Sequence, residues 1–141
     1  MIYLDASVIV AILGRESDAD TLVARIEAAE RPFLVSPTGL FEAAMGLAAK
    51  KARETGKALD AQFISLAQQA VQQFVADIAA NEITITPAIG TAALEAAKRY
   101  GRAVGSAAAL NFGDCFAYAC AKEYGAALIY KGNDFVETDL G

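Results

Sequence analysis

Four acidic residues fall at positions where an α/β fold would gather them at one edge of a sheet. Asp5 ends an apolar run near the N-terminus, and Asp134 follows the last predicted strand. Glu42 and Asp114 lie in the first turns of two predicted helices. Ligands of open α/β sheets bind outside the carboxyl ends of the strands, so these acids are expected to face one site. Gathered carboxylates repel one another unless a cation neutralises them, and hard oxygen ligands suit Mg²⁺ or Mn²⁺.

The composition removes most other kinds of catalytic site. The chain has 141 residues, 0 histidines and 2 cysteines. Without histidine it has no Ser-His-Asp or Cys-His site, and it has too few cysteines for a structural zinc cluster. Twelve basic and seventeen acidic side chains give a net charge of −5, which argues against a basic surface that coats duplex nucleic acid.

Each helix-start acid also has a purely structural explanation. Acidic side chains in a first helical turn complement the helix dipole, and Glu42 and Asp114 are each consistent with that role. Asp114 lies three residues after Asn111, a spacing close to that of a capping box. Asp5 is harder to explain in this way, because it ends a buried strand and no local partner is evident. The combination of acids therefore indicates a site more strongly than any one of them.

Several other polar residues are candidates for supporting roles. Ser7 is placed to hydrogen-bond Asp5 or a metal-bound water, and it is equally placed to cap a helix. Lys131 is a candidate contact for a substrate phosphate or a partner for an acid. Lys50 and Arg53 share a helical face with Glu42, and solvated surface charge is the simpler explanation for them.

The hydrophobic pattern predicts strands that alternate with helices. The expected strands are residues 2–4, 33–36, 83–86 and 127–130. Residues 6–13 either extend the first strand or form a short helix that Ser7 caps and Gly14 stops. The expected helices cover residues about 17–30, 39–55, 58–80, 87–100 and, from a cap at Asn111, the segment to Tyr124. This alternation predicts one α/β domain over residues 1–141, with a mostly parallel sheet covered by helices.

The compartment is predicted to be the cytoplasm. Cys115 and Cys120 lie five residues apart in one predicted helix, roughly 7.5 Å along its axis, which is too far for a disulfide. They are expected to be free thiols in a reducing environment. The N-terminus lacks the features of a signal peptide, and no apolar run is long enough to cross a membrane.

Three segments of the chain resemble a known protein family. MIYLDAS at the start, LFEAAMGL in the middle and LNFGDCFAYACAKEYGAALIYKGNDFVETDL at the end are similar to PIN-domain ribonuclease toxins of the VapC type. The resemblance implies a three-layer PIN-like fold and Mg²⁺- or Mn²⁺-dependent endoribonuclease activity. It also implies a type II toxin that is controlled by a VapB-type antitoxin and is usually a homodimer. The helix at 58–80 is a candidate dimer surface, although its apolar stripe is equally consistent with a core position.

The family acids map onto this chain residue by residue. Asp5, Glu42 and Asp114 match the three most regular acids, and the resemblance implies that Asp5 and Asp114 are direct metal ligands. Many relatives have an acid where Asn133 stands, whereas here the next residue, Asp134, is acidic. Either Asp134 takes that role as a metal ligand or Asn133 binds through its amide oxygen or a water.

Two other classes of function remain open at this stage. A DNA nuclease or phosphatase would use the same acids, although Ser7 stands where an aspartyl-phosphate mechanism would need a second aspartate. A non-catalytic binding module of the same fold is supported only by the departure at Asn133. Comparing cleavage of RNA, DNA and a phosphomonoester distinguishes a ribonuclease from a DNA nuclease or a phosphatase. Titration with Mn²⁺ distinguishes these enzymes from a non-catalytic module.

Overall fold

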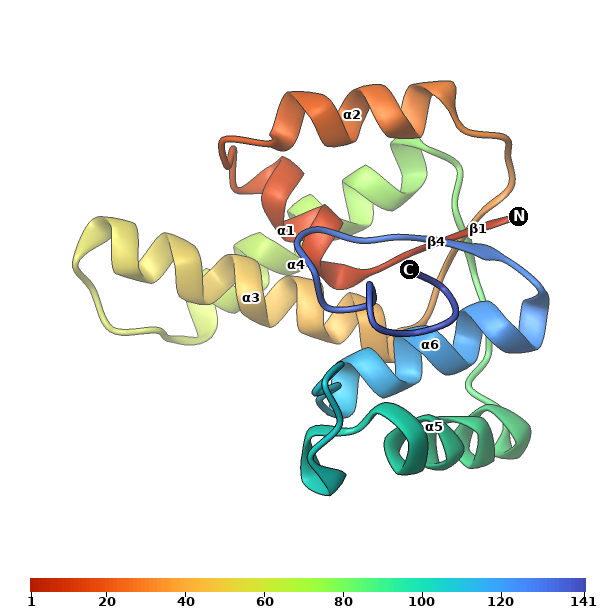
Figure 1. Ribbon diagram of the computed structural model, residues 1–141. Helices are drawn as coiled ribbons and strands as arrows, with labels where there is room; N and C mark the ends of the chain where they lie inside the picture. Colours follow the sequence, from red (N-terminus) through yellow and green to blue (C-terminus); the bar gives the residue numbers. More distant parts are fainter.

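The chain forms a parallel β-sheet between two layers of helices (Figure 1). The computed structural model describes all residues from 1 to 141. The strands are β1 (Ile2–Leu4), β2 (Phe33–Val35), β3 (Asn81–Glu82) and β4 (Ala127–Ile129). The helices are α1 (Ala6–Leu13), α2 (Ala19–Ala28), α3 (Pro37–Thr55), α4 (Ala61–Asp77), α5 (Pro87–Tyr100) and α6 (Phe112–Tyr124), with a 3₁₀ turn η1 (Arg102–Val104) between the last two.

The sheet brings the ends of β1, β2 and β4 together at one edge. Its strand order is β3-β2-β1-β4, and every neighbouring pair is parallel. Tyr3 is opposite Leu34 on one side and Leu128 on the other. Because all strands run the same way, the residues that follow β1, β2 and β4 meet at the carboxyl edge.

Alternate strand residues divide the interior into two hydrophobic cores, as the two-residue period of a strand requires. Tyr3, Leu34 and Leu128 pack with α5 and α6 on one face. Leu4 and Ile129 pack on the other face, with α1, α2, α3 and α4. The sheet is therefore buried on both sides, which is typical of parallel sheets.

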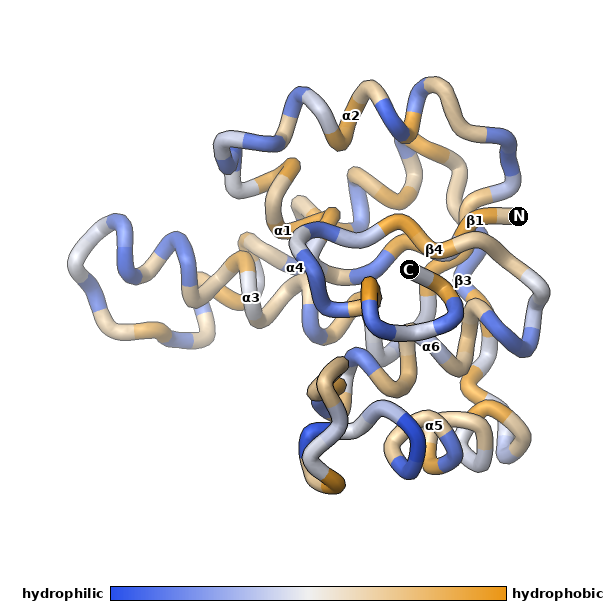
Figure 2. Tube along the Cα trace, viewed as in Figure 1, coloured by the Kyte–Doolittle hydropathy of each residue, from blue (hydrophilic) through white to orange (hydrophobic).

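The two helical layers differ in shape. In Figure 1, α5 and α6 lie together below the sheet, while α3 and α4 extend sideways as a pair. Figure 2 shows hydrophobic strands at the centre and a mostly hydrophilic end to the α3–α4 pair. None of the helices has the length and hydropathy that a membrane span requires.

The predicted fold class is confirmed, and most elements lie where the sequence pattern placed them. The helix expected at 39–55 begins two residues earlier, because the Ser36 side chain accepts a hydrogen bond from the Gly39 amide and caps it. The helix expected at 58–80 is shorter, because Asp60 caps it and accepts from the Phe63 amide. Cys115 and Cys120 are buried free thiols, as predicted.

The prediction of a strand at residues 83–86 is wrong. The strand in this region is β3, which pairs Asn81 with Leu34 and Glu82 with Val35. The Ile83 amide makes the last hydrogen bond to β2, to the Val35 carbonyl at 2.8 Å, because β2 ends at Val35 and the chain turns into α3. Thr86 serves instead as the N-cap of α5, accepting a hydrogen bond from the Ile89 amide.

Candidate active site

Asp5 lies at the junction of β1 and α1. It is 6% exposed, and its backbone amide donates to the carbonyl of Ile129 in β4 at 3.0 Å. Its side chain is the N-cap of α1: Oδ2 accepts from the Ser7 amide at 3.1 Å and from the Ser7 hydroxyl at 2.5 Å. The prediction that Asp5 lacks a local partner is therefore wrong. Both side-chain hydrogen bonds go to Oδ2, and Oδ1 takes part in none.

Asp114 is held in the first turn of α6 by a capping box. The Asn111 side chain accepts from the Asp114 amide at 2.9 Å, and Asp114 Oδ2 accepts from the Asn111 amide at 3.1 Å. The structural role suspected from the sequence is thus present. It also fixes the direction of the carboxylate and occupies only one of its two oxygens.

Glu42 reaches the same edge from the second turn of α3. Its carboxylate lies against Gly113 of α6, where an added Cβ would be 1.9 Å from Oε2 and 2.4 Å from Oε1. The absence of a side chain at position 113 therefore allows α3 and α6 to approach with Glu42 between them. Glu42 makes no hydrogen bond or ion pair of its own among the side-chain contacts of the chain.

Asp134 lies in the loop that follows β4. This loop turns at Gly132, whose φ is +76°, and is fixed by Phe135, which is 0% exposed and packs edge-on against Tyr130. Asp134 and Asn133 are both exposed. Asp134 is close enough to Asp5 and Asp114 for its charge to raise the pKa of both.

Asp5, Glu42 and Asp114 are buried or half-buried and close to one another, and no ion pair neutralises them, so their charged forms are disfavoured. Burial, followed by repulsion from Asp5 and Asp114, raises the pKa of Glu42 to about 7. Burial also raises the pKa of Asp114 to about 6, with repulsion from Asp134 and Asp5 adding to it. Burial is likewise the main reason that the pKa of Asp5 is raised, partly opposed by the hydrogen bonds from Ser7. The four charges act on one another, as carboxylates around a shared site should.

None of these four acids has a salt bridge, although other acids in the chain do. Lysine partners are found instead at Glu16, Asp18, Glu54, Glu95 and Asp139. No three of the acidic and cysteine side chains are close enough as they stand to enclose a metal ion. None of the four acids lines the cavity between α3 and α4 or the one between α5 and α6. The structure therefore gathers the acids loosely at an open edge and does not form a closed cage.

The residues expected to support the site make internal contacts. The Ser7 hydroxyl donates to Asp5 and accepts from the Lys131 amide at 3.0 Å. The Lys131 ammonium pairs with Glu16 and, at 3.4 Å, with Asp18. Lys50 pairs with Glu16 and Glu54, whereas Arg53 is exposed.

Sequence reasoning missed two residues at this edge. Arg102 in η1 lowers the pKa of Asp114 by its positive charge and belongs to no salt bridge. It is the one charged residue in the stretch from 101 to 110, a signal that was available in the sequence. Gly113 was missed as well, and only the approach of Glu42 from a distant helix reveals its importance.

Comparison with known proteins places this fold in a defined class. The PIN domain family matches residues 2–140. A solved structure, VapC20 of Mycobacterium tuberculosis, described as a sarcin-ricin loop cleaving toxin, superposes with a TM-score of 0.70. The superposition covers 96% of this chain and 93% of that one at 16% identity, so it bears on the fold alone.

Sequence relatives narrow the class further. The chain is 47% identical over 142 residues to VapC ribonuclease R02377 of Rhizobium meliloti, with both chains fully covered. It is 33% identical to Ribonuclease VapC30 of Mycobacterium tuberculosis, covering 97% of this chain and 94% of the relative. Ribonuclease VapC of Mycolicibacterium smegmatis is 34% identical, with 97% and 95% covered. The chain therefore belongs to the VapC ribonuclease family of PIN-domain proteins.

Proposed function

We propose that the chain is a metal-dependent endoribonuclease and the toxin of a type II toxin–antitoxin pair. The observation that carries this proposal is the set of four acids without salt bridges at the carboxyl edge of the sheet. The relatives named above are ribonucleases, which points to RNA as the substrate class. Cleavage is assigned to Asp5, Glu42 and Asp114.

The donor set at this edge suits Mg²⁺ or Mn²⁺. All its groups are oxygens, and Asp5 offers a side-chain oxygen that no hydrogen bond uses. Mg²⁺ is usually bound by one or two carboxylates and keeps several waters, so an open edge is compatible with it. Asp5 and Asp114 would be the direct ligands, and Asp134 would complete the set. Asn133, the neighbouring alternative, is equally exposed.

The protein's own contribution is to fix these groups before substrate arrives. Ser7 holds Asp5 through two hydrogen bonds, and the capping box holds Asp114. With a divalent ion held by Asp5 and Asp114, the site would gain neutralising charge and a water of lowered pKa. In the metal-free chain, burial and repulsion from Asp5 and Asp114 raise the pKa of Glu42 to about 7, so Glu42 can exchange a proton near neutral pH. Arg102 is the cation best placed to meet a phosphate, since it already acts on Asp114.

The test is cleavage of RNA by variants that keep the fold. Asp5→Asn retains N-cap ability, because asparagine and aspartate are comparable caps. Both Asp5→Asn and Asp114→Asn should lower the cleavage rate by roughly 100-fold or more, and EDTA should abolish wild-type cleavage. Glu95→Gln is the control, because Glu95 pairs with Lys98 on an exposed face of α5. Full activity in either aspartate variant would exclude this site.

Substrate controls separate the remaining alternatives. RNA, single-stranded DNA and a phosphomonoester are offered to the same preparation. Cleavage of DNA or of the monoester in preference to RNA would favour the DNA nuclease or phosphatase. Absence of all cleavage, together with absence of Mn²⁺ binding, would favour a non-catalytic module.

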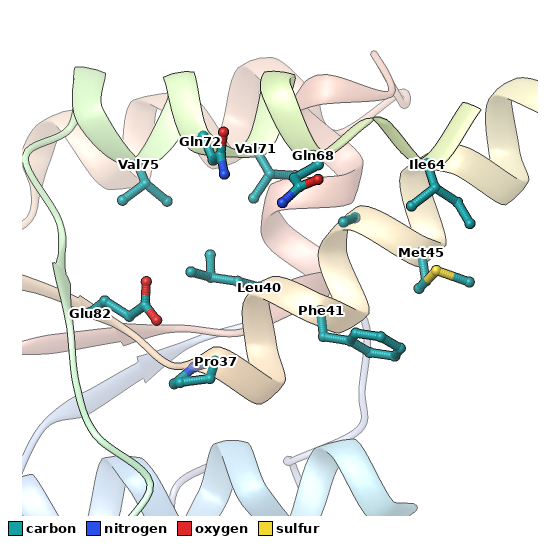
Figure 3. A pocket seen from close by; sticks show the side chains of 11 residues that line it. Pro37, Leu40, Phe41, Met45, Ile64, Gln68, Val71, Gln72, Val75 and Glu82 are labelled. Atoms are coloured by element: carbon teal, nitrogen blue, oxygen red, sulfur yellow. The ribbon is translucent and has the colours of Figure 1, made fainter. Parts of the chain in front are cut away.

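We propose the groove between α3 and α4 as the binding site for a VapB-type antitoxin. Its volume is about 520 Å³. In Figure 3, Leu40 of α3 points toward Val71 and Val75 of α4, and Glu82 closes one end. A segment with apolar side chains and basic flanks fits this groove and the net charge of −5.

A second copy of the chain is proposed to cover a different apolar face. The helix expected at 58–80 is not well suited to this role, because Ala67 and Val71 are buried against the body. Large exposed side chains gather instead around α5, η1 and α6: Leu94 is 66% exposed and Phe112 is 73% exposed. They flank a hollow of about 810 Å³, so projecting and recessed parts lie on the same surface. A two-fold dimer needs such self-complementarity.

A further inference from the structure

We propose that Glu16 is a positioning residue that holds three acid-bearing segments in register. It lies in the turn between α1 and α2, away from the carboxylates themselves. With Asp18, Lys50 and Lys131 it forms an ion-pair network, here called the Glu16 cluster. The inference deepens the proposed metal site and rests on it only for its metal-binding readout.

Glu16 joins two lysines that come from distant parts of the chain. One carboxylate oxygen pairs with the Lys131 ammonium, and the other is 3.8 Å from the Lys50 ammonium. Lys131 is also 3.4 Å from Asp18, and Lys50 is 3.4 Å from Glu54. Through these ion pairs, Glu16 connects the α1–α2 turn to the loop after β4 and to the C-terminal half of α3.

Each of the three joined segments carries part of the candidate active site. Lys131 precedes Asp134 by three residues in the loop after β4. Lys50 lies eight residues after Glu42 on α3. Glu16 follows α1, whose N-cap is Asp5.

Lys131 makes a second connection through its backbone. Its amide donates to the Ser7 hydroxyl at 3.0 Å, and that hydroxyl donates to Asp5. The side chain and the main chain of Lys131 therefore both fix the start of the loop that carries Asp134. Phe135, fully buried, fixes the loop on the other side of the acid.

The stem of Lys50 lies against Gly14 at the end of α1. A Cβ at Gly14 would lie 2.8 Å from both Cδ and Cε of Lys50, and 2.7 Å from the carbonyl oxygen of Val10. The lysine stem therefore packs directly on the end of α1. This contact adds to the ion pairs that the same side chain makes, and it brings the end of α1 against α3.

The energetic contribution of the cluster to global stability should be small. The side chains of Glu16, Lys50 and Lys131 are 22%, 23% and 34% exposed, and ion pairs of this kind contribute between about 0 and 1 kcal/mol. Their effect should appear in the position of the Asp134 loop, because few other polar contacts hold it. A positioning role and a purely stabilising role thus predict different measurements.

The experiment uses the full chain and the variants Glu16→Gln and Lys131→Met. Amide hydrogen exchange is measured without metal at Lys131 and Val136, whose amides donate to the Ser7 hydroxyl and to the Asn133 carbonyl on the two sides of Asp134. Mn²⁺ affinity is measured by calorimetry. Glu95→Gln is the matched control, because it removes the same charge from an ion pair on α5. Thermal unfolding of all variants reports global stability.

We expect Glu16→Gln and Lys131→Met to speed exchange of the Lys131 and Val136 amides and to weaken Mn²⁺ binding about tenfold, as loss of outer contacts to ligands does. The double variant should bind Mn²⁺ no more weakly than the single variant that shows the larger loss of affinity, because both changes break the same connection. Exchange in Glu16→Gln equal to that in Glu95→Gln would overturn the positioning role. A wild type that binds no Mn²⁺ would contradict the proposed metal site, and the exchange comparison would then decide the role of Glu16 alone.

Discussion

Glu42 shows how one side chain is affected by its surroundings at this edge. It is half-buried, has no cationic partner and faces Asp5 and Asp114, so its charged form is disfavoured and its pKa rises to about 7. An ordinary glutamate has a pKa of 4.5. The folded chain therefore binds a proton at Glu42 more tightly than the unfolded chain does.

This difference predicts that the metal-free protein loses stability as pH rises. Between its unfolded and folded pKa values the folded state holds more protons, so the free energy of unfolding falls with increasing pH. Urea unfolding at about pH 5 and about pH 8 should show the loss in the wild type, and Glu42→Gln should reduce it. After solvent screening the difference is on the order of 1 kcal/mol.

The control for that comparison is Glu95→Gln, which alters an exposed ion pair remote from the acids. Its pH dependence should match that of the wild type. A Glu42→Gln variant with the same loss of stability as the wild type would show that Glu42 does not lie among uncompensated charges.

At the residue scale, the position of the acids at one edge of the sheet was easier to predict from the sequence than their hydrogen-bond partners. The types and spacing of Asp5, Glu42 and Asp114 suffice to suggest a shared edge, because each follows or begins a recognisable element. The partners of these side chains depend on backbone dihedrals and on packing. Asp5 was expected to be isolated, yet it caps α1 because the chain turns directly from strand to helix.

At the element scale, the contact between α3 and α6 positions two of the acids. Gly113 leaves room for the Glu42 carboxylate, and the capping box fixes Asp114 one residue later. The two helices therefore place their acids by different means, one through a close approach and the other through hydrogen bonds at its start.

Gly113→Ala should separate activity from stability. The added methyl group must displace the Glu42 carboxylate, whose end is flexible, while alanine favours the helix by about 0.5–1 kcal/mol. We expect an unchanged or higher melting temperature, together with an RNA cleavage rate reduced at least tenfold. Gly90→Ala is the stability control, because nothing lies within 4 Å of a Cβ there. Full cleavage by Gly113→Ala would show that the position of Glu42 is unimportant.

Element boundaries were predictable where capping residues mark them. Pro87 marks the start of α5, and Asn111 and Gly125 mark the two ends of α6, as the sequence shows directly. The β-branched run at 83–86 was misleading, because strand length is set by the partner and β2 offers only three residues. Local propensity was overridden by the length of the neighbouring strand.

At the scale of the whole molecule, the sequence predicted the layered fold but gave little information on its free surfaces. Alternating strands and helices define a parallel sheet with two covered faces. The exposure of Leu94 and Phe112 depends on how α5 and α6 pack, which the sequence pattern does not reveal. The apolar face that they form is therefore evident only from the structure.

That face leads to a prediction about assembly. The wild type should sediment as a dimer, and Leu94→Glu should shift it to monomer by placing a charge in the apolar contact. Leu66→Glu, on the exposed side of α4 at 53% exposure, is the matched control and should remain dimeric. Dissociation by Leu66→Glu but not by Leu94→Glu would move the interface to α4.

The most direct test of the central claim is calorimetric titration of the wild type, Asp5→Asn, Asp114→Asn and Glu95→Gln with Mn²⁺ at neutral pH. We expect saturable binding by the wild type and Glu95→Gln, and at least tenfold weaker binding by both aspartate variants. Equal affinity in all four proteins, or no binding by the wild type, would contradict a metal site at the carboxyl edge of the sheet.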